Sequence, residues 1–388
     1  MNKLKGNSWH SDPSPAKHAS SGFQKKRCSD KFIGTPSSNF QKGPMKIREI
    51  RVPGYERVLL GSDDTASYQG IIAIHSTALG PAVGGTRYWN YKTEDDAVTD
   101  ALRLARGMTY KNALAGLPFG GGKSIIMRDG KAANREQLFR AHGRMVNSLT
   151  GKYFTAEDVG TSPADMEFIL KESEYVAGLQ GRSGDPSPHT ARGVFRAMQV
   201  AAKHKWGSDD LAGKTIAIQG CGHVGYFLAG ELARVGARLI VTDVDSARVK
   251  RVVDDHGATA IAPEGIYSAE ADIFAPCALG GVLNDQTISQ LKATLVVGAA
   301  NNQLLEPHHG DLLQQRAVLY APDYAANAGG VINGCCREML GWDVPKTLAK
   351  IDAIYDTLLT IFAIAEQEKI PTYQAADRLA EERFMVKG

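Results

Sequence analysis

The sequence predicts an α/β protein of two domains, the second of which is a doubly wound parallel sheet. Its 388 residues are enough for two domains of ordinary size. Before residue 188, strand-like and helical segments mix without a fixed order, and after it short apolar runs alternate strictly with amphipathic helical segments. Strict alternation is typical of buried parallel strands with helices on both faces. We therefore expect an α/β domain over residues 45–187 and a doubly wound domain over residues 188–340.

The composition is that of a soluble protein, with 43% hydrophobic and 22% charged residues. No apolar run reaches the roughly 18 residues that span a bilayer, and the N-terminus has no apolar stretch of a secretory signal. We expect a cytoplasmic protein with no membrane partner.

The first 44 residues differ from the rest of the chain, because they are rich in Ser, Lys, Asn, Gly and Pro and have no hydrophobic period. They predict a disordered extension, with a targeting segment as the less favoured alternative. This extension holds eight basic residues and two Asp, a charge of +6, so a chain of net charge +3 leaves −3 for the remainder. A nucleic-acid surface is therefore not expected on the folded body.

The first domain contains three recognisable elements. Residues 70–76 form a strand-like run, residues 95–116 have a helical apolar period, and residues 124–127 read as a short buried strand after a triple glycine. The apolar side chains of the helix are Val98, Leu102, Ala105 and Met108. The segment GDPSPHT at 184–190 marks a boundary or hinge, because its two prolines disfavour continued regular structure.

The second domain follows a regular order of elements. Its strand-like segments and the two clearest helices between them are 214–220, 223–237, 238–243, 246–257, 271–279, 294–300 and 317–323. The last part of the chain, residues 341–388, reads as helices that fold back onto the first domain.

A glycine-rich turn, Gly220-Cys221-Gly222-His223-Val224-Gly225, joins the first strand and the first helix of the second domain. Gly-x-Gly-x-x-Gly at this junction predicts a Rossmann-like dinucleotide site. Gly220 permits the tight turn, Gly222 lets the backbone approach the pyrophosphate at the helix N-terminus, and Gly225 lets helix and strand pack closely.

The cofactor preference follows from Asp243, which ends the next strand. Its carboxylate can accept both ribose hydroxyls, whereas it would repel a 2′-phosphate, and neither Val244 nor Asp245 supplies an arginine for that phosphate. We expect NAD rather than NADP. Helix capping is the alternative role for Asp243.

Two lysines and an aspartate suggest the chemistry. LPFGGGKS at 117–124 is like a phosphate-binding loop, but Leu117 stands where that loop needs its first glycine, so a nucleoside triphosphate site is disfavoured. Lys111 and Lys123 flank this Gly-rich turn, and Asp158 lies in TAEDVGTS. Beside a nicotinamide domain, such a set suggests that one lysine binds a carboxylate and the other handles a proton.

Neither cysteine nor histidine suggests a metal or a disulfide framework. The five cysteines form no Cys-x-x-Cys pair, which indicates a reducing compartment. His308 and His309 are adjacent and are expected to point apart, so no metal site is predicted.

Seven longer motifs extend along the chain. They are LGPAVGGTRYW, ALRLARGMTYKNALAGLPFGGGKS, TAEDVGTSPADM, GDPSPHTARGVFRAM, FAPCALGGVLND, VVGAANNQL and YAPDYAANAGGVIN. Together they resemble the glutamate, leucine, phenylalanine and valine family of amino-acid dehydrogenases, most closely its leucine-specific members. The resemblance covers residues 46–386.

The resemblance implies oxidative deamination of an L-amino acid by NAD to a 2-oxo acid and ammonium, in a homo-oligomer. By motif match, Lys111 binds the substrate carboxylate, Lys123 is the base that activates water, and Asp158 exchanges a proton with the amino group. It further implies that the substrate also contacts Leu79 and Gly80, and that the cofactor contacts Thr190, Cys277, Ala278, Ala299, Asn301 and Asn302.

The resemblance also implies a side-chain pocket lined by Ala156 and Val331, whose size fits leucine and admits valine and isoleucine. Gly334 stands where a larger apolar residue is expected and could open room for a ring, so phenylalanine is the alternative substrate. A nicotinamide-binding regulator without turnover is the alternative from another class, although it need not keep both lysines and the aspartate together.

Overall fold

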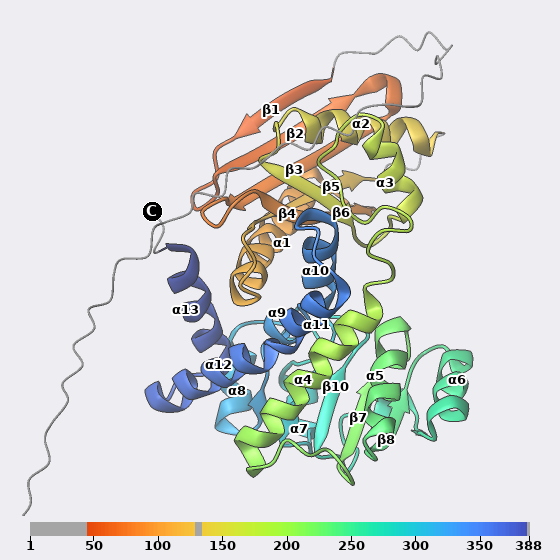
Figure 1. The fold of residues 1–388 in the computed structure, drawn as a ribbon, viewed down its shortest axis with the longest axis vertical. Helices are drawn as coiled ribbons and strands as arrows, with labels where there is room; N and C mark the ends of the chain where they lie inside the picture. Colours follow the sequence, from red (N-terminus) through yellow and green to blue (C-terminus); the bar gives the residue numbers. More distant parts are fainter. Residues whose placement is uncertain (1–44, 129–133, 386–388) are drawn as a thin grey trace, which may run out of the picture. The chain divides into compact units, whose positions relative to one another are not determined.

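The computed structural model describes residues 45–128 and 134–385. They form two α/β parts, each built on a six-stranded sheet, and the predicted two-domain fold class is thereby confirmed (Figure 1). The extension predicted over residues 1–44 lies outside the described residues. Within residues 45–128 and 134–385, no helix is both long and apolar enough to cross a membrane.

The N-terminal sheet is mixed, with strand order β1-β2-β3-β5-β4-β6. Strands β1, β2, β3 and β5 pair antiparallel, whereas β4 pairs parallel with both β5 and β6. Parallel pairing brings the carboxyl ends of β4, β5 and β6 to one edge of the sheet. The strands are β1 (Lys46–Ile50), β2 (Arg57–Asp63), β3 (Tyr68–Ser76), β4 (Ala82–Trp89), β5 (Gly120–Met127) and β6 (Tyr153–Glu157).

Helices cover both faces of this sheet, because alternate strand residues point to opposite sides. Ile71 packs with helix α1 (Glu94–Leu114) on one face, and Ile72 packs with α2 (Arg135–Asn147) and α3 (Pro163–Leu170) on the other. The predicted helix over 95–116 is therefore present. Its fully buried stripe runs along Ala97, Ala101, Ala105 and Thr109, so it shares Ala105 with the predicted stripe and differs by one position at the other three.

The second sheet is entirely parallel, with order β9-β8-β7-β10-β11-β12. In chain order this is 3-2-1-4-5-6, the arrangement of a dinucleotide-binding doubly wound fold. Its central strand β7 is followed by the predicted glycine-rich turn. The strands are β7 (Thr215–Gln219), β8 (Arg238–Thr242), β9 (Thr259–Ala260), β10 (Ile273–Pro276), β11 (Leu295–Val296) and β12 (Leu319–Tyr320).

The described residues after 186 also form α-helices. They are α4 (Ser187–Trp206), α5 (His223–Arg234), α6 (Ser246–His256), α7 (Asp285–Gln290), α8 (His308–Gln315), α9 (Asp323–Ala326), α10 (Gly329–Gly334), α11 (Val344–Asp352), α12 (Ile354–Glu368) and α13 (Thr372–Met385).

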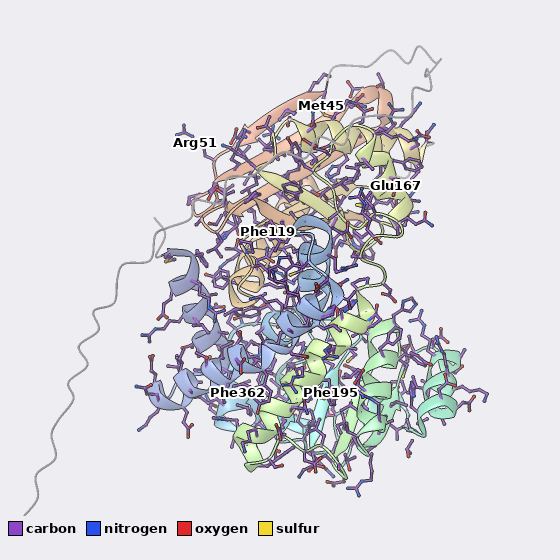
Figure 2. The ribbon with its side chains drawn as sticks, viewed as in Figure 1. Met45, Arg51, Phe119, Glu167, Phe195 and Phe362 are labelled. Carbon is purple, nitrogen blue, oxygen red and sulfur yellow. The ribbon has the colours of Figure 1, made fainter. Side chains whose placement is uncertain are left out.

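One hydrophobic cluster contains residues from both parts of the fold. It includes Phe119 just before β5, Phe195 on α4 and Phe362 on α12, which are labelled in Figure 2. The last helix, α13, contacts α1: Tyr110 donates to Glu381, and Arg383 donates to the Leu114 carbonyl at 2.7 Å. The C-terminal helices therefore fix the end of α1, where Lys111 lies.

Candidate active site

Lys123 and Asp158 form a buried ion pair at the parallel end of the N-terminal sheet. Lys123 lies on β5, Asp158 directly follows β6, and Lys123 Nζ is 2.8 Å from Asp158 Oδ2. The Lys123 side chain is only 7% exposed. A buried ammonium is costly unless it is paired, and the Asp158 carboxylate is the partner of Lys123 at this position.

The triple glycine is part of β5 itself and not a turn before it. A Cβ on Gly121 would lie 2.0 Å from the Thr109 amide of α1, and a Cβ on Gly122 would lie 2.8 Å from the Tyr153 ring. The expectation of a Gly-rich turn before the strand is therefore wrong at these two positions. Their missing side chains let α1 and Tyr153 pack directly on the strand that carries Lys123.

Arg87 on β4 is a residue of the site that the sequence analysis missed. Its Nε donates to Asp158 Oδ2 at 3.1 Å, and its Nη1 donates to Asp100 Oδ2 at 2.9 Å. The only signal in the sequence was its position, because β4 lies beside β6 and every second residue of a strand shares a face.

The pKa of Asp158 shows the balance of these contacts. Burial alone would raise it, but the positive charges of Lys123 and Arg87 outweigh burial and lower the pKa to about 2. In this arrangement Asp158 is a carboxylate, and it can take up a proton only if a cationic partner moves away or gives up its own proton.

Lys111 lies in the last turn of α1 and reaches the other sheet's loops. Its Nζ donates to Asn301 Oδ1 at 3.1 Å. Desolvation lowers the pKa of Lys111 to about 8, the nearby charge of Lys123 acts in the same direction, and Asp323 and Asp158 oppose the shift. A partly desolvated cation of this kind binds a carboxylate more strongly than an exposed lysine does.

The loop that holds Asn301 is fixed by two further residues that the sequence analysis did not single out. Asn327 Nδ2 donates to the Ala299 carbonyl at 3.0 Å and to Asn301 Oδ1 at 2.8 Å. Asp323 Oδ2 accepts from the Asn302 amide at 2.7 Å. Both lie in the segment YAPDYAAN, residues 320–327.

The dinucleotide turn has the geometry that its sequence predicts. Gly220 has φ +107°, which favours glycine, and a Cβ there would lie 2.7 Å from the Ala278 amide. A Cβ on Gly225 would lie 2.0 Å from the Gly220 carbonyl oxygen, so the start of α5 packs on the turn. Gly222, by contrast, has nothing within 4 Å of an added Cβ, which leaves open space at the N-terminus of α5.

Asp243 lies directly after β8 and is tied to the same turn. Its Oδ2 accepts from the Cys221 amide at 2.7 Å, and its Oδ1 accepts from the Asp245 amide at 3.0 Å. The N-cap of α6 is Asp245, whose side chain accepts from Ala247. The alternative role of Asp243 as a helix cap is therefore wrong.

The remaining residues predicted at the cofactor surround this turn or lie near α10. Cys277 and Ala278 pack against Gly220. His223 is exposed, and its Nδ1 lies 3.6 Å from Asp185 Oδ2. Val224, the next residue, packs on the hydrophobic core. Thr190 lies on α4, where its Oγ1 would be 2.7 Å from a Cβ on Gly330 of α10.

The residues predicted for the substrate come from both parts of the fold. Gly80 is joined to the first residue of β5, because its carbonyl accepts from the Gly120 amide at 3.1 Å, and Leu79 precedes it. Ala156 lies on β6, two residues before Asp158. Val331 and Gly334 lie on α10, and Leu79 and Val331 are half-buried against the same hydrophobic cluster.

Comparison with known proteins decides the family. Residues 56–175 match the model of the Glu/Leu/Phe/Val dehydrogenase dimerisation domain, and residues 243–385 match the model of the glutamate/leucine/phenylalanine/valine dehydrogenases. The chain belongs to this family. The predicted resemblance to the Glu/Leu/Phe/Val dehydrogenases is confirmed.

Relatives of this family match most of the chain. Leucine dehydrogenase of Geobacillus stearothermophilus is 54% identical over 333 residues, which are 85% of this chain and 90% of that protein. Valine dehydrogenase of Streptomyces coelicolor is 47% identical over 337 residues, 85% of this chain and 92% of that protein. The crystal structure of L-tryptophan dehydrogenase from Nostoc punctiforme superposes with a TM-score of 0.77 at 43% identity, covering 86% of this chain and 97% of that one.

As a member of the Glu/Leu/Phe/Val dehydrogenase family, the protein is an amino-acid dehydrogenase, and a nicotinamide dinucleotide is the cofactor class of this family. The prediction of an oxidoreductase is therefore confirmed. The alternative of a cofactor-binding regulator without turnover loses its support, because the relatives that match most of this chain are enzymes.

Proposed function

We propose that this dehydrogenase uses NAD to deaminate hydrophobic L-amino acids to 2-oxo acids and ammonium, and that L-leucine is its best substrate. The observation that carries the proposal is the buried Lys123–Asp158 pair, together with the contact between Lys111 and Asn301. Lys111 thereby reaches a loop of the dinucleotide-binding part, and the charges of Lys123 and Asp158 lie close enough to act on its pKa. The names of the matched relatives support a hydrophobic substrate.

Each charged residue has a separate role in the proposed reaction. Lys111 binds the substrate carboxylate, and Asp158 accepts a proton from the substrate amino group. Bound NAD would supply the acceptor for the hydride of the α-carbon. Lys123 then takes a proton from the water that adds to the imine carbon, and ammonium leaves. Lys123 enters this step as the neutral amine, because its own proton has left to solvent, and the proton that Asp158 accepted returns to the nitrogen that departs as ammonium. The proton taken from water stays on Lys123 Nζ, 2.8 Å from Asp158 Oδ2, and is released to solvent after turnover.

The turn at Gly220 fits a dinucleotide, because the space over Gly222 is open and the N-terminus of α5 faces it. We propose NAD rather than NADP because the half-buried Asp243 carboxylate would meet the ribose. Nearby Arg248 lies 3.2 Å from Asp245, so it is already paired with a carboxylate.

Replacing Asp243 tests the cofactor preference. Asp243→Ala is expected to raise the KM for NAD at least about tenfold, because it removes charge-assisted hydrogen bonds to the ribose. The ratio of kcat/KM with NAD to kcat/KM with NADP should therefore fall. Asp243→Asn is the matched control, since its amide oxygen can still accept from the Cys221 amide while the repulsion of a 2′-phosphate is lost. A cofactor ratio that stays unchanged in both variants would assign Asp243 a purely structural role.

We further propose that Ala156, Val331 and Leu79 form an apolar pocket for the substrate side chain. Phenylalanine is the alternative substrate because of Gly334. A Cβ added there meets nothing within 4 Å, and the open space could admit a ring. The model of a dimerisation domain that matches residues 56–175 supports a homo-oligomer.

A panel of L-amino acids with NAD tests the substrate. We expect the highest kcat/KM for leucine, with isoleucine and valine lower by about 10- to 200-fold for each missing or misplaced methylene. Gly334→Val should reduce kcat/KM for phenylalanine more than for leucine, and the open surroundings of Gly334 make misfolding of this variant unexpected. A tenfold preference of the wild type for phenylalanine, or equal losses in the variant, would contradict the pocket.

A further inference from the structure

A cluster of two histidines and one aspartate lies outside the proposed active site. His308 and His309 begin α8, and Asp285 begins α7. One ligand atom from each residue lies within 4.8 Å of the other two. The expectation that the adjacent histidines point apart is wrong, because their ring centroids are 3.9 Å apart. The side chains in the first turn of α8 converge on Asp285.

His309 has a buried ring nitrogen without a hydrogen-bond partner. Its side chain is 2% exposed, and its Nε2 has no hydrogen-bond partner. A buried ring nitrogen without a partner is uncommon, because leaving it unpaired costs free energy. This nitrogen lies 3.6 Å from Asp285 Oδ1, and His308 Nε2 lies 3.8 Å from the same oxygen.

We propose that Asp285, His308 and His309 bind a divalent transition-metal ion of the zinc class. Ligands at about 2.0–2.1 Å from a tetrahedral ion are about 3.3–3.4 Å from one another, so the distances of 3.6 Å and 3.8 Å need to close by only a few tenths of an ångström. Imidazole with carboxylate is a ligand set that suits zinc, and water completes the tetrahedron.

Backbone contacts hold the three ligands together. The Leu283 amide donates to the Gln303 carbonyl at 2.9 Å, and the Leu305 amide donates to the Leu283 carbonyl at 3.0 Å, so the segments that lead to Asp285 and to His308 run side by side. The Glu306 carbonyl lies 3.1 Å from His309 Nδ1 and can accept its proton, which leaves the Nε2 lone pair free for a metal.

Two features oppose the ion and set its affinity. The Glu306 amide lies 2.9 Å from the same Nδ1 and favours the other tautomer. The N-termini of α7 and α8 also carry partial positive charge. The Asp285 carboxylate, which is 80% exposed, compensates this charge and is free to move toward the ion. We therefore expect a site that exchanges its ion and can be emptied with a chelator.

Cobalt is the probe, because its visible absorption reports coordination by protein ligands. Untagged full-length protein is treated with a chelator and titrated with Co²⁺, and Zn²⁺ is then added as a competitor. The expected result is one Co²⁺ per chain with an absorption band that Zn²⁺ abolishes. His308→Gln and Asp285→Asn should each weaken binding at least tenfold, and both side chains are more than half exposed, so folding should survive.

Asp311→Asn is the matched control, since Asp311 lies on α8 but outside the cluster and should leave Co²⁺ affinity unchanged. His10 and His18 of the extension are present in every variant, so they do not affect the comparison. No protein-bound Co²⁺ spectrum, or equal affinity in His308→Gln and wild type, would overturn the proposal and leave Asp285 as a simple polar partner of the histidines.

Discussion

Lys123→Ala is expected to lower kcat by roughly 10²–10⁴-fold, because the general base that activates water is lost. This corresponds to about 2.7–5.5 kcal/mol of transition-state stabilisation. Dinucleotide binding should persist, since the Gly220 turn and Asp243 lie on the other sheet. Steady-state kinetics with leucine, and NAD binding measured by fluorescence or calorimetry, check the two parts of this result.

Two further variants separate chemistry from packing. Lys123 is buried, so Lys123→Met fills most of the same volume without a base, and it should be as inactive as Lys123→Ala. Lys152→Ala removes an exposed lysine just before β6 and should leave kcat unchanged. Activity of the Lys123 variants within tenfold of the wild type would exclude Lys123 as the base.

Asp158→Asn is the second substitution with a large expected effect. It removes the proton acceptor for the substrate amino group and leaves the Lys123 ammonium buried without its carboxylate. We expect kcat to fall at least about 100-fold. We also expect a loss of stability, because breaking a buried ion pair on one side costs about 3–5 kcal/mol. Kinetics and the free energy of unfolding in denaturant measure the two effects.

Asp100→Asn is the matched control for this variant. Asp100 also accepts from Arg87, at 2.9 Å, but it accepts from Tyr91 and not from Lys123. Its replacement removes a carboxylate from Arg87 and keeps the Lys123–Asp158 pair, so kcat should stay within about tenfold of the wild type, a change of no more than about 1.4 kcal/mol. Equal losses in the Asp158 and Asp100 variants would show that Asp158 acts only within a charge network.

The dinucleotide-binding part could be predicted from sequence because its signals are local. The strand, the Gly220 turn, the helix and Asp243 follow one another within about 30 residues, as the fingerprint requires. The predicted strands over 271–279 and 294–300 were longer than β10 and β11, since apolar loop residues near a site read like strand residues. Periodicity alone does not separate the two.

The rest of the candidate site depends on contacts between distant segments. Arg87 and Asp158 are 71 positions apart and meet only because β4 and β6 are parallel neighbours. The glycines at 121 and 122 suggested a loop, whereas their partners are Thr109 and Tyr153. His308 and His309 were expected to point apart, but their ring centroids are 3.9 Å apart. Ring orientation at the start of a helix is set by packing that the sequence does not reveal.

The most direct test of the proposed function is the stoichiometry of turnover with L-leucine and NAD. The amounts of 2-oxo acid, ammonium and reduced nicotinamide are measured at several times in one reaction. We expect the three products in equal amounts from the wild type, and at least about 100-fold less of each from Lys123→Ala in the same time. Reduced nicotinamide without matching ammonium, or no product from leucine while another class of substrate is oxidised, would contradict the account.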